Sequence, residues 1–117
     1  MRALVINLPT VDADAVFAGM QTAILRRCMP SGCQPGMRII FHFGGVMLGE
    51  ATITSACIDT AENIAARFAG QAWQTIADAA EYLDGARRPG AIILHSPQRY
   101  EPARPWRGIQ PLGHLYI

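Results

Sequence analysis

The sequence predicts an α+β fold, in which an antiparallel β-barrel carries a short N-terminal helix and an inserted pair of helices. Strand-like segments and a glycine-centred hairpin surround a helical region at residues 59–85. The strands and helices do not alternate, which argues against a doubly wound parallel sheet. Because the chain shows no internal repeat and no linker, residues 1–117 are expected to form a single domain.

The first third of the chain is predicted to contain a strand, a helix and a second strand. Residues 2–8 are apolar and β-prone. Residues 9–18 begin with proline and end before Gly19, which suits the positive φ found at helix ends. Residues 21–27 have the composition of a strand, and the proline- and glycine-rich residues 28–36 must form a loop.

The clearest local pattern is a hairpin. Residues 38–43 and 46–57 are β-prone segments on either side of Gly44-Gly45. Two glycines between such segments are typical of a tight hairpin turn, because both central residues of that turn need positive φ. The pattern therefore predicts a central antiparallel strand pair.

The helical region is predicted to hold two helices. Asp59 and Glu62 stand three residues apart before an apolar-periodic run, which favours a capping box for a helix that ends near Gly70. A second helix is expected from Gln71 onward. Its apolar stripe, at close to helical spacing, comprises Trp73, Ile76, Ala77, Ala80 and Leu83. This stripe is expected to pack on the barrel.

The C-terminal part is predicted to be a strand, a loop and a short last strand. Residues 91–95 form a continuous apolar segment. Residues 97–111 carry four prolines and are expected to form a long loop. Residues 112–116 are expected to form the short last strand.

Composition limits the function classes. Half of the residues are hydrophobic and 16% are charged, which excludes a disordered or fibrous chain. A net charge of +1 does not favour broad nonspecific binding to nucleic acid. The chain contains no lysine, so an anionic partner would have to meet a local cluster of arginines.

Cysteine usage and hydropathy indicate a soluble, cytoplasmic protein. The apolar segment 3–8 is too short for a signal peptide, and no segment approaches the roughly 20 apolar residues of a membrane span. Three cysteines, an odd number, fit a reducing compartment better than a disulfide framework. Cys28 and Cys33 are spaced as a partial zinc motif, but without two further ligands at matching spacing we expect no metal and no cofactor.

Residues 19–26 read Gly-Met-Gln-Thr-Ala-Ile-Leu-Arg. This segment resembles the signature of the ASCH domain, a small β-barrel module of the PUA-like superfamily, which runs glycine, any, lysine, two of any, glutamate, any, arginine. Gly19 and Arg26 match, whereas Gln21 replaces the lysine and Ile24 replaces the glutamate. Further likenesses extend the resemblance over nearly the whole chain, to small bacterial or phage-type members: Pro35-Gly36 before a central strand, residues 48–53 and residues 105–108.

The resemblance implies a cleft between barrel and helices, which relatives use for RNA or modified nucleosides. Some relatives are thought to bind RNA, some to cleave it, and one group hydrolyses acetylated cytidine with a lysine at the signature's lysine position and a threonine at its glutamate position. Gln21 cannot act as a general base, and Ile24 offers neither a carboxylate nor a hydroxyl. We therefore expect no lysine-dependent hydrolase chemistry.

Arg26 is the first candidate ligand contact, because a guanidinium suits phosphate, carboxylate or a base edge. Strand alternation places Thr22 on the same face, Gln21 holds the signature's second position, and Glu50 could supply a carboxylate. The alternatives are that Arg26 is a rim residue paired with Glu50 or an aspartate, and that Glu50 is a solvated strand charge.

The proline-rich segment adds three further candidates, Tyr100, Trp106 and Arg107. Aromatic rings stack on bases, and arginine contacts phosphate. The alternative is that Trp106 packs over the barrel mouth.

The leading hypothesis is therefore an RNA- or nucleotide-binding module of ASCH type. One alternative is an enzyme that acts on RNA or on a modified nucleoside, a ribonuclease or amidohydrolase, with a rearranged catalytic set. The other is a protein-interaction domain.

Overall fold

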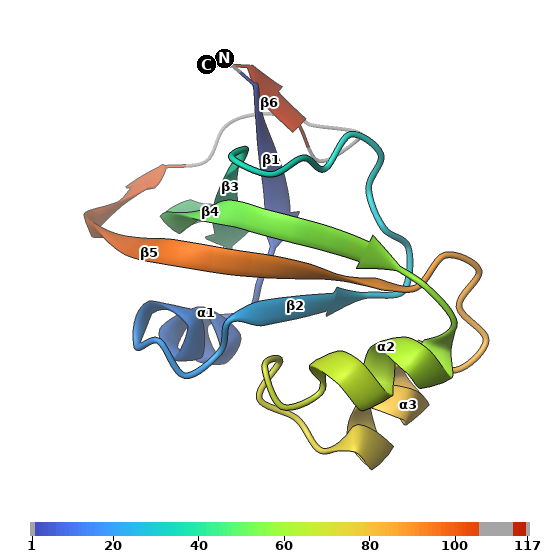
Figure 1. Cartoon of the computed structure of the whole chain (residues 1–117). Coiled ribbons are helices and arrows are strands. Elements are labelled where there is room, and N and C mark those ends of the chain that lie inside the picture. Colours follow the sequence, from blue (N-terminus) through green and yellow to red (C-terminus); the bar gives the residue numbers. More distant parts are fainter. Residues whose placement is uncertain (1, 106–113, 117) are drawn as a thin grey trace.

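A computed structural model describes residues 2–105 and 114–116. Its elements follow one another as shown in Figure 1: β1 (Arg2–Asn7), α1 (Thr10–Phe17), β2 (Ala23–Arg26), β3 (Arg38–Phe43), β4 (Val46–Ile58), α2 (Ala61–Phe68), α3 (Ile76–Leu83), β5 (Gly90–Pro105) and β6 (His114–Tyr116). No helix among the described residues combines the length and the apolar character needed to cross a membrane.

The six strands form one curled sheet in the order β2-β5-β4-β3-β1-β6, and the helices lie on its lower side in Figure 1. The predicted α+β class, a sheet with helices packed against it, is confirmed. One detail of the prediction is wrong, because β1 and β3 run parallel, whereas the other neighbouring pairs are antiparallel. From β1 the chain passes through α1 into β2, which pairs with β5 at one edge of the sheet. It then returns across the sheet, so that β3 starts beside the start of β1.

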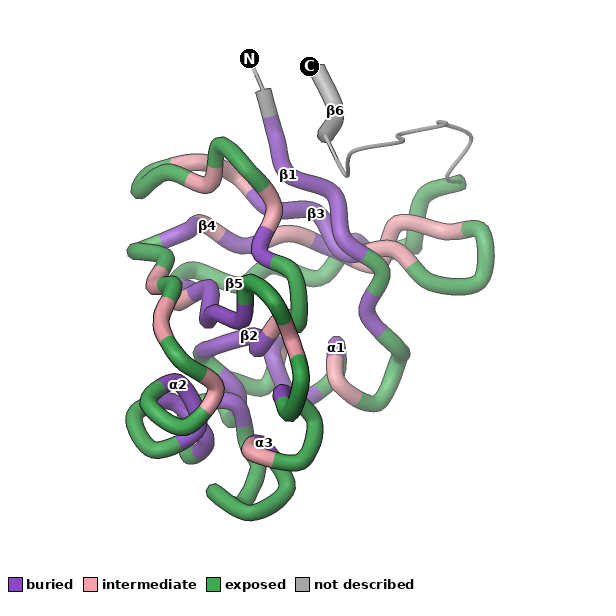
Figure 2. Tube along the Cα trace, turned by 90° about the vertical axis from the view of Figure 1, so that its right-hand side faces the viewer, coloured by how far each residue is buried: buried purple, intermediate pink, exposed green. Residues whose placement is uncertain are grey.

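Two apolar clusters fill the space between the sheet and the helices, and a smaller one lies on the other face. The largest cluster joins α1 to the sheet through residues such as Val16, Phe41 and Ile53. A second cluster packs α2 and α3 against β2 and β5. Figure 2 shows buried residues along β1 and β3 and exposed residues around the outside of α2 and α3.

Gly49 allows α1 to approach the sheet closely. A Cβ at this position would overlap the ring of Phe17, the last residue of α1, and the carbonyl oxygen of Gln98. Phe17 in turn meets Phe41 edge to face, with ring centroids 6.0 Å apart. The glycine therefore fixes the position of the helix that begins beside the pocket described below.

The two inserted helices are capped by threonines. Thr60, not Asp59, caps α2, and its hydroxyl accepts from the Asn63 amide at 3.2 Å. The expected capping box with Glu62 is therefore wrong. Asp59 instead accepts from the Thr60 amide at 2.7 Å, and this bond holds the pKa of the Asp59 carboxyl below its ordinary value. Thr75 caps α3 in the same way, through the Asp78 amide at 3.1 Å.

The predicted apolar stripe is only partly correct, because α3 begins at Ile76 rather than near Gln71. Trp73 and Ile76 are exposed, and Leu83 is buried together with Ala79. A turn between α2 and α3 breaks the helical periodicity that the stripe assumed.

Strand β5 is longer than predicted, since residues 97–105, expected to be a loop, continue it. These residues pair with β4 alone, because β2 extends only far enough to pair with residues 90–93 of β5. Proline is tolerated on such an edge, where no second neighbour needs its missing N–H. The prolines therefore mark the segment of β5 that extends past β2 and lies at the edge of the sheet.

A candidate ligand pocket between β2 and the helices

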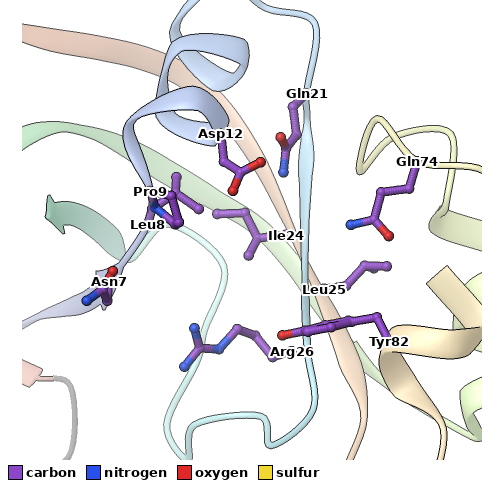
Figure 3. A pocket seen from close by; sticks show the side chains of 10 residues that line it. All are labelled: Asn7, Leu8, Pro9, Asp12, Gln21, Ile24, Leu25, Arg26, Gln74 and Tyr82. Atoms are coloured by element: carbon purple, nitrogen blue, oxygen red, sulfur yellow. The ribbon is translucent and has the colours of Figure 1, made fainter. Parts of the chain in front are cut away.

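A pocket of about 270 Å³ lies where the end of β1, the start of α1, β2 and α3 meet. Figure 3 shows its lining, which combines one guanidinium, one carboxylate, three amides and a phenol with an apolar wall. The lining residues are Asn7, Leu8, Pro9, Asp12, Gln21, Ile24, Leu25, Arg26, Gln74 and Tyr82.

The turn that ends α1 positions the side of the pocket that β2 provides. The Gly19 amide donates to the carbonyl of Val16, and the Met20 amide to that of Ala15, both at 3.0 Å. Gly19 has a φ of 79°, the left-handed conformation that this type of helix end requires. The turn leads directly into Gln21 and β2.

Three positions of the ASCH-like signature line the pocket: Gln21, Ile24 and Arg26. Gln21 is 6% exposed, and its side-chain amide donates to the backbone carbonyl of Ala23 at 3.1 Å. Ile24 is 4% exposed and belongs to the main apolar cluster. At the two positions that differ from the signature, the pocket therefore has an amide, from Gln21, and a branched alkyl group, from Ile24.

Arg26 is half-buried and extends along the pocket toward Asn7 in Figure 3. Within residues 2–105 and 114–116, no hydrogen bond or ion pair engages its guanidinium. The expected alternative, a pair with Glu50 or an aspartate, is therefore not formed among these residues. Burial raises the pKa of the Cys33 thiol. The positive charge of Arg26, and to a smaller extent that of Arg88, opposes this rise.

The carboxylate of the pocket comes from Asp12, which sequence reasoning missed. Asp12 lies in the first turn of α1, is half-buried, and points toward Ile24 in Figure 3. Among the described residues it makes no ion pair with Arg26 or any other cation. No motif could have identified it, because its place depends on how α1 packs against β2.

Gln74 and Tyr82 also reach the pocket from the helical insertion, and neither was a candidate. Gln74 lies in the turn before α3, and Tyr82 in its last turn. Figure 3 shows both side chains across the pocket from Pro9 and Asp12. Helical periodicity had suggested only a packing role for this part of the chain.

Thr22 lies outside the pocket, contrary to the prediction. Its side chain is exposed, while its amide donates to the Gln71 carbonyl at 2.8 Å and its carbonyl accepts from the Leu94 amide at 2.8 Å. Strand alternation failed here because β2 begins only at Ala23. Gln21 precedes the strand and reaches the same pocket as Ile24.

Glu50 and Tyr100 also lie outside the pocket, on the opposite face of the sheet. Glu50 accepts from the Tyr100 hydroxyl at 3.0 Å and from Arg38 at 3.5 Å. The guanidinium of Arg104 lies 4.2 Å from the centre of the Tyr100 ring. These two residues belong to a structural cluster, and Trp106 and Arg107 lie outside the described residues.

Cys28 and Cys33 have the spacing of a partial zinc motif. Cys28 is exposed and Cys33 is half-buried. In the part of the chain that the structure describes, no three histidine, cysteine or acidic side chains come together as a metal site would require.

Comparison with solved structures identifies the fold. The ASCH protein from Zymomonas mobilis superposes with a TM-score of 0.78 at 20% identity, covering 98% of this chain and 87% of that one. A tyrosine-to-phenylalanine variant of it gives 0.79 at 20% identity, covering 98% and 89%, and a serine-to-alanine variant gives 0.78 at 20% identity, covering 98% and 87%. No family model and no curated protein matches the chain.

Proposed function

We propose that this ASCH-fold chain binds a nucleotide, as part of single-stranded RNA or as a nucleotide-like molecule, in the pocket between β2 and the helices. The observation that carries the proposal is the half-buried Arg26 guanidinium in the pocket wall, which no acidic residue among those described neutralises. A cation removed from water is stabilised by an anionic partner, and a phosphate suits its planar donors. The module would act in the cytoplasm, where its three free thiols stay reduced.

The rest of the lining suits a nucleobase. Asp12 can accept hydrogen bonds from ring or exocyclic N–H groups, and the amides of Gln21 and Gln74 can both donate and accept. Leu8 and Ile24 supply apolar surface for the faces of a flat ring. At about 270 Å³, the pocket is slightly smaller than the roughly 300–1,000 Å³ typical of drug-sized ligands, so a single nucleotide unit is the most that it could hold.

The proposed module lacks lysine-dependent hydrolase chemistry. An amide at Gln21 and an alkyl group at Ile24 provide neither an amine nor an acid at those two points of the pocket. The chain has no lysine elsewhere that could take this role.

Calorimetric titration with an unstructured eight-nucleotide RNA and with the four ribonucleoside 5′-monophosphates tests the proposal. The Arg26→Ala variant is expected to lose most of the binding, and to show a shallower dependence of affinity on salt by about one phosphate contact. Arg87→Ala is the matched control, because it removes an exposed arginine charge that lies outside the pocket. No binding to wild-type protein at low salt, or equal losses in both variants, would contradict the proposal.

A catalytic function is the second candidate, favoured by one observation. Asp12 brings a carboxylate to the pocket, although the signature's own acid position is Ile24. A carboxylate within reach of a bound nucleotide could act as a general base. Incubation of the octamer and of acetylated cytidine with wild-type protein and with Asp12→Asn tests this candidate; turnover that depends on Asp12 would establish it.

A further inference from the structure

Trp73 occupies a position that normally belongs to glycine. Its φ is 59°, and its amide donates to the Gly70 carbonyl at 3.0 Å, while the Gln74 amide donates to the Ala69 carbonyl at 2.9 Å. These two bonds define the same type of helix end that Gly19 forms after α1. This type of helix end thus follows α1 with a glycine and α2 with a tryptophan.

Folding does not explain the indole at this position. A left-handed conformation costs an L-residue with a bulky side chain free energy that glycine would not lose. Burial could offset that cost, but Trp73 is 53% exposed. Observed strain together with exposure of a large aromatic ring points to a role in binding.

The turn that carries Trp73 is held firmly beside the pocket. The carbonyl of Gln71 accepts from the amides of Thr22 and Ala23 at 2.8 and 3.1 Å, which joins the turn to the start of β2. Ala72 is 2% exposed and anchors the turn in the core. The next residue after the tryptophan, Gln74, lines the pocket. The backbone that carries the exposed indole is therefore fixed, and Trp73 is the sequence neighbour of a residue that lines the pocket.

We propose that Trp73 stacks on a second base, adjacent along the strand to the nucleotide in the pocket, so that the ligand is single-stranded RNA of at least two nucleotides. The inference rests on the proposed function above. Because the pocket could hold at most one nucleotide unit, neighbouring units must lie on the surface outside it. An exposed indole on a firmly held turn is the kind of platform on which unpaired bases stack.

Fluorescence gives a direct test. The chain has two tryptophans, so Trp106→Phe leaves Trp73 as the only one. Titration of this variant with the eight-nucleotide RNA is expected to quench its emission, and a pocket-filling 5′-monophosphate is expected to bind with little quenching. RNA binding without quenching would overturn the stacking role.

Affinity gives the second test, with Trp73→Gly as the variant, since glycine suits the backbone there and avoids the risk of misfolding. Octamer binding is expected to weaken about 5- to 150-fold, the range measured for loss of one stacked base, while monophosphate affinity stays unchanged. Ile58→Ala is the control, because it removes a comparably exposed apolar side chain that does not line the pocket.

The outcomes separate the two proposals. Octamer binding that needs Arg26 but is unaffected by Trp73→Gly refutes the stacking role and leaves the pocket's function standing. Absence of any nucleotide binding to wild-type protein refutes both. A wild-type dimer that Trp73→Gly dissociates, without an effect on RNA affinity, assigns the indole to a protein contact and also refutes the stacking role.

Discussion

The hydroxyl of Tyr100 donates a hydrogen bond to the carboxylate of Glu50 at 3.0 Å, on the face of the sheet opposite the pocket. Glu50 also accepts from Arg38, and Arg104 lies over the Tyr100 ring. The two predicted ligand contacts are therefore partners of each other. Their cluster fixes the edge half of β5 against β4 and β3.

The pKa of Tyr100 is expected to lie above its ordinary value of 10. Burial is the main cause, followed by the hydrogen bond to Glu50 and the negative charge of that residue. Because the folded state holds the proton more tightly than the unfolded state, this contribution to stability is complete below pH 10 and is lost as the pH rises through the folded-state pKa. Titration of the Tyr100 ring signals by NMR measures the shift.

Glu50→Gln is the variant that checks the cause of this shift. It removes the charge and keeps an acceptor, so the Tyr100 midpoint should move toward 10 without returning to it completely. An unchanged midpoint would show that Glu50 makes no contribution.

Arg27 is expected to stabilise the fold, in contrast to its neighbour Arg26. Its guanidinium donates to the carbonyls of Tyr82 and Asp84 at the C-terminal end of α3, the second at 2.9 Å. Such carbonyls have no partner within the helix, and a cation there also suits the helix dipole. Arg27→Ala should lower the free energy of unfolding by about 0.5–1.5 kcal/mol.

Urea denaturation of the two arginine variants measures this difference. Arg26→Ala is expected to have little effect on the denaturation midpoint, because no described carboxylate or carbonyl is left without a partner when Arg26 is removed. A larger loss of stability in Arg26→Ala than in Arg27→Ala would contradict the roles assigned to these residues.

Gly49→Ala is expected to destabilise the protein by about 1–3 kcal/mol or more. The added Cβ would overlap the Phe17 ring and the backbone carbonyl of Gln98, and the backbone cannot move aside without breaking the β4–β5 pairing. Thermal unfolding measures the loss. Gly70→Ala is the control, since a Cβ at Gly70 meets no atom within 4 Å; equal melting temperatures for both variants would show that the contact with α1 is not close.

The sequence predicted most of the fold because its strong signals are local. The Gly44-Gly45 turn, with φ values of 63° and 82°, determines the β3–β4 hairpin wherever the rest of the chain lies. Gly19 likewise ends α1 as expected. The parallel pairing of β1 with β3 could not be predicted in this way, because it depends on where the chain returns after β2.

The site was predicted less completely, for a physical reason. Arg26 and Gln21 belong to one segment with a recognisable spacing, and the structure places both in the pocket lining. Asp12, Gln74 and Tyr82 come from three other elements, and only tertiary packing brings them there. The same packing places Glu50 on the other face of the sheet, although its strand was predicted correctly.

Two variants of Trp73 are expected to differ in stability but not in RNA binding. Trp73→Ala and Trp73→Gly both remove the indole, but only glycine relieves the φ of 59°. Trp73→Gly should therefore be more stable than Trp73→Ala, by about 1 kcal/mol in the free energy of unfolding, while the two variants bind the RNA octamer equally weakly. Urea denaturation and calorimetric titration of the same two samples provide both measurements. If alanine proved as stable as glycine, the left-handed conformation at this turn would be wrong; if the alanine variant alone retained RNA affinity, the indole would not be the group that binds.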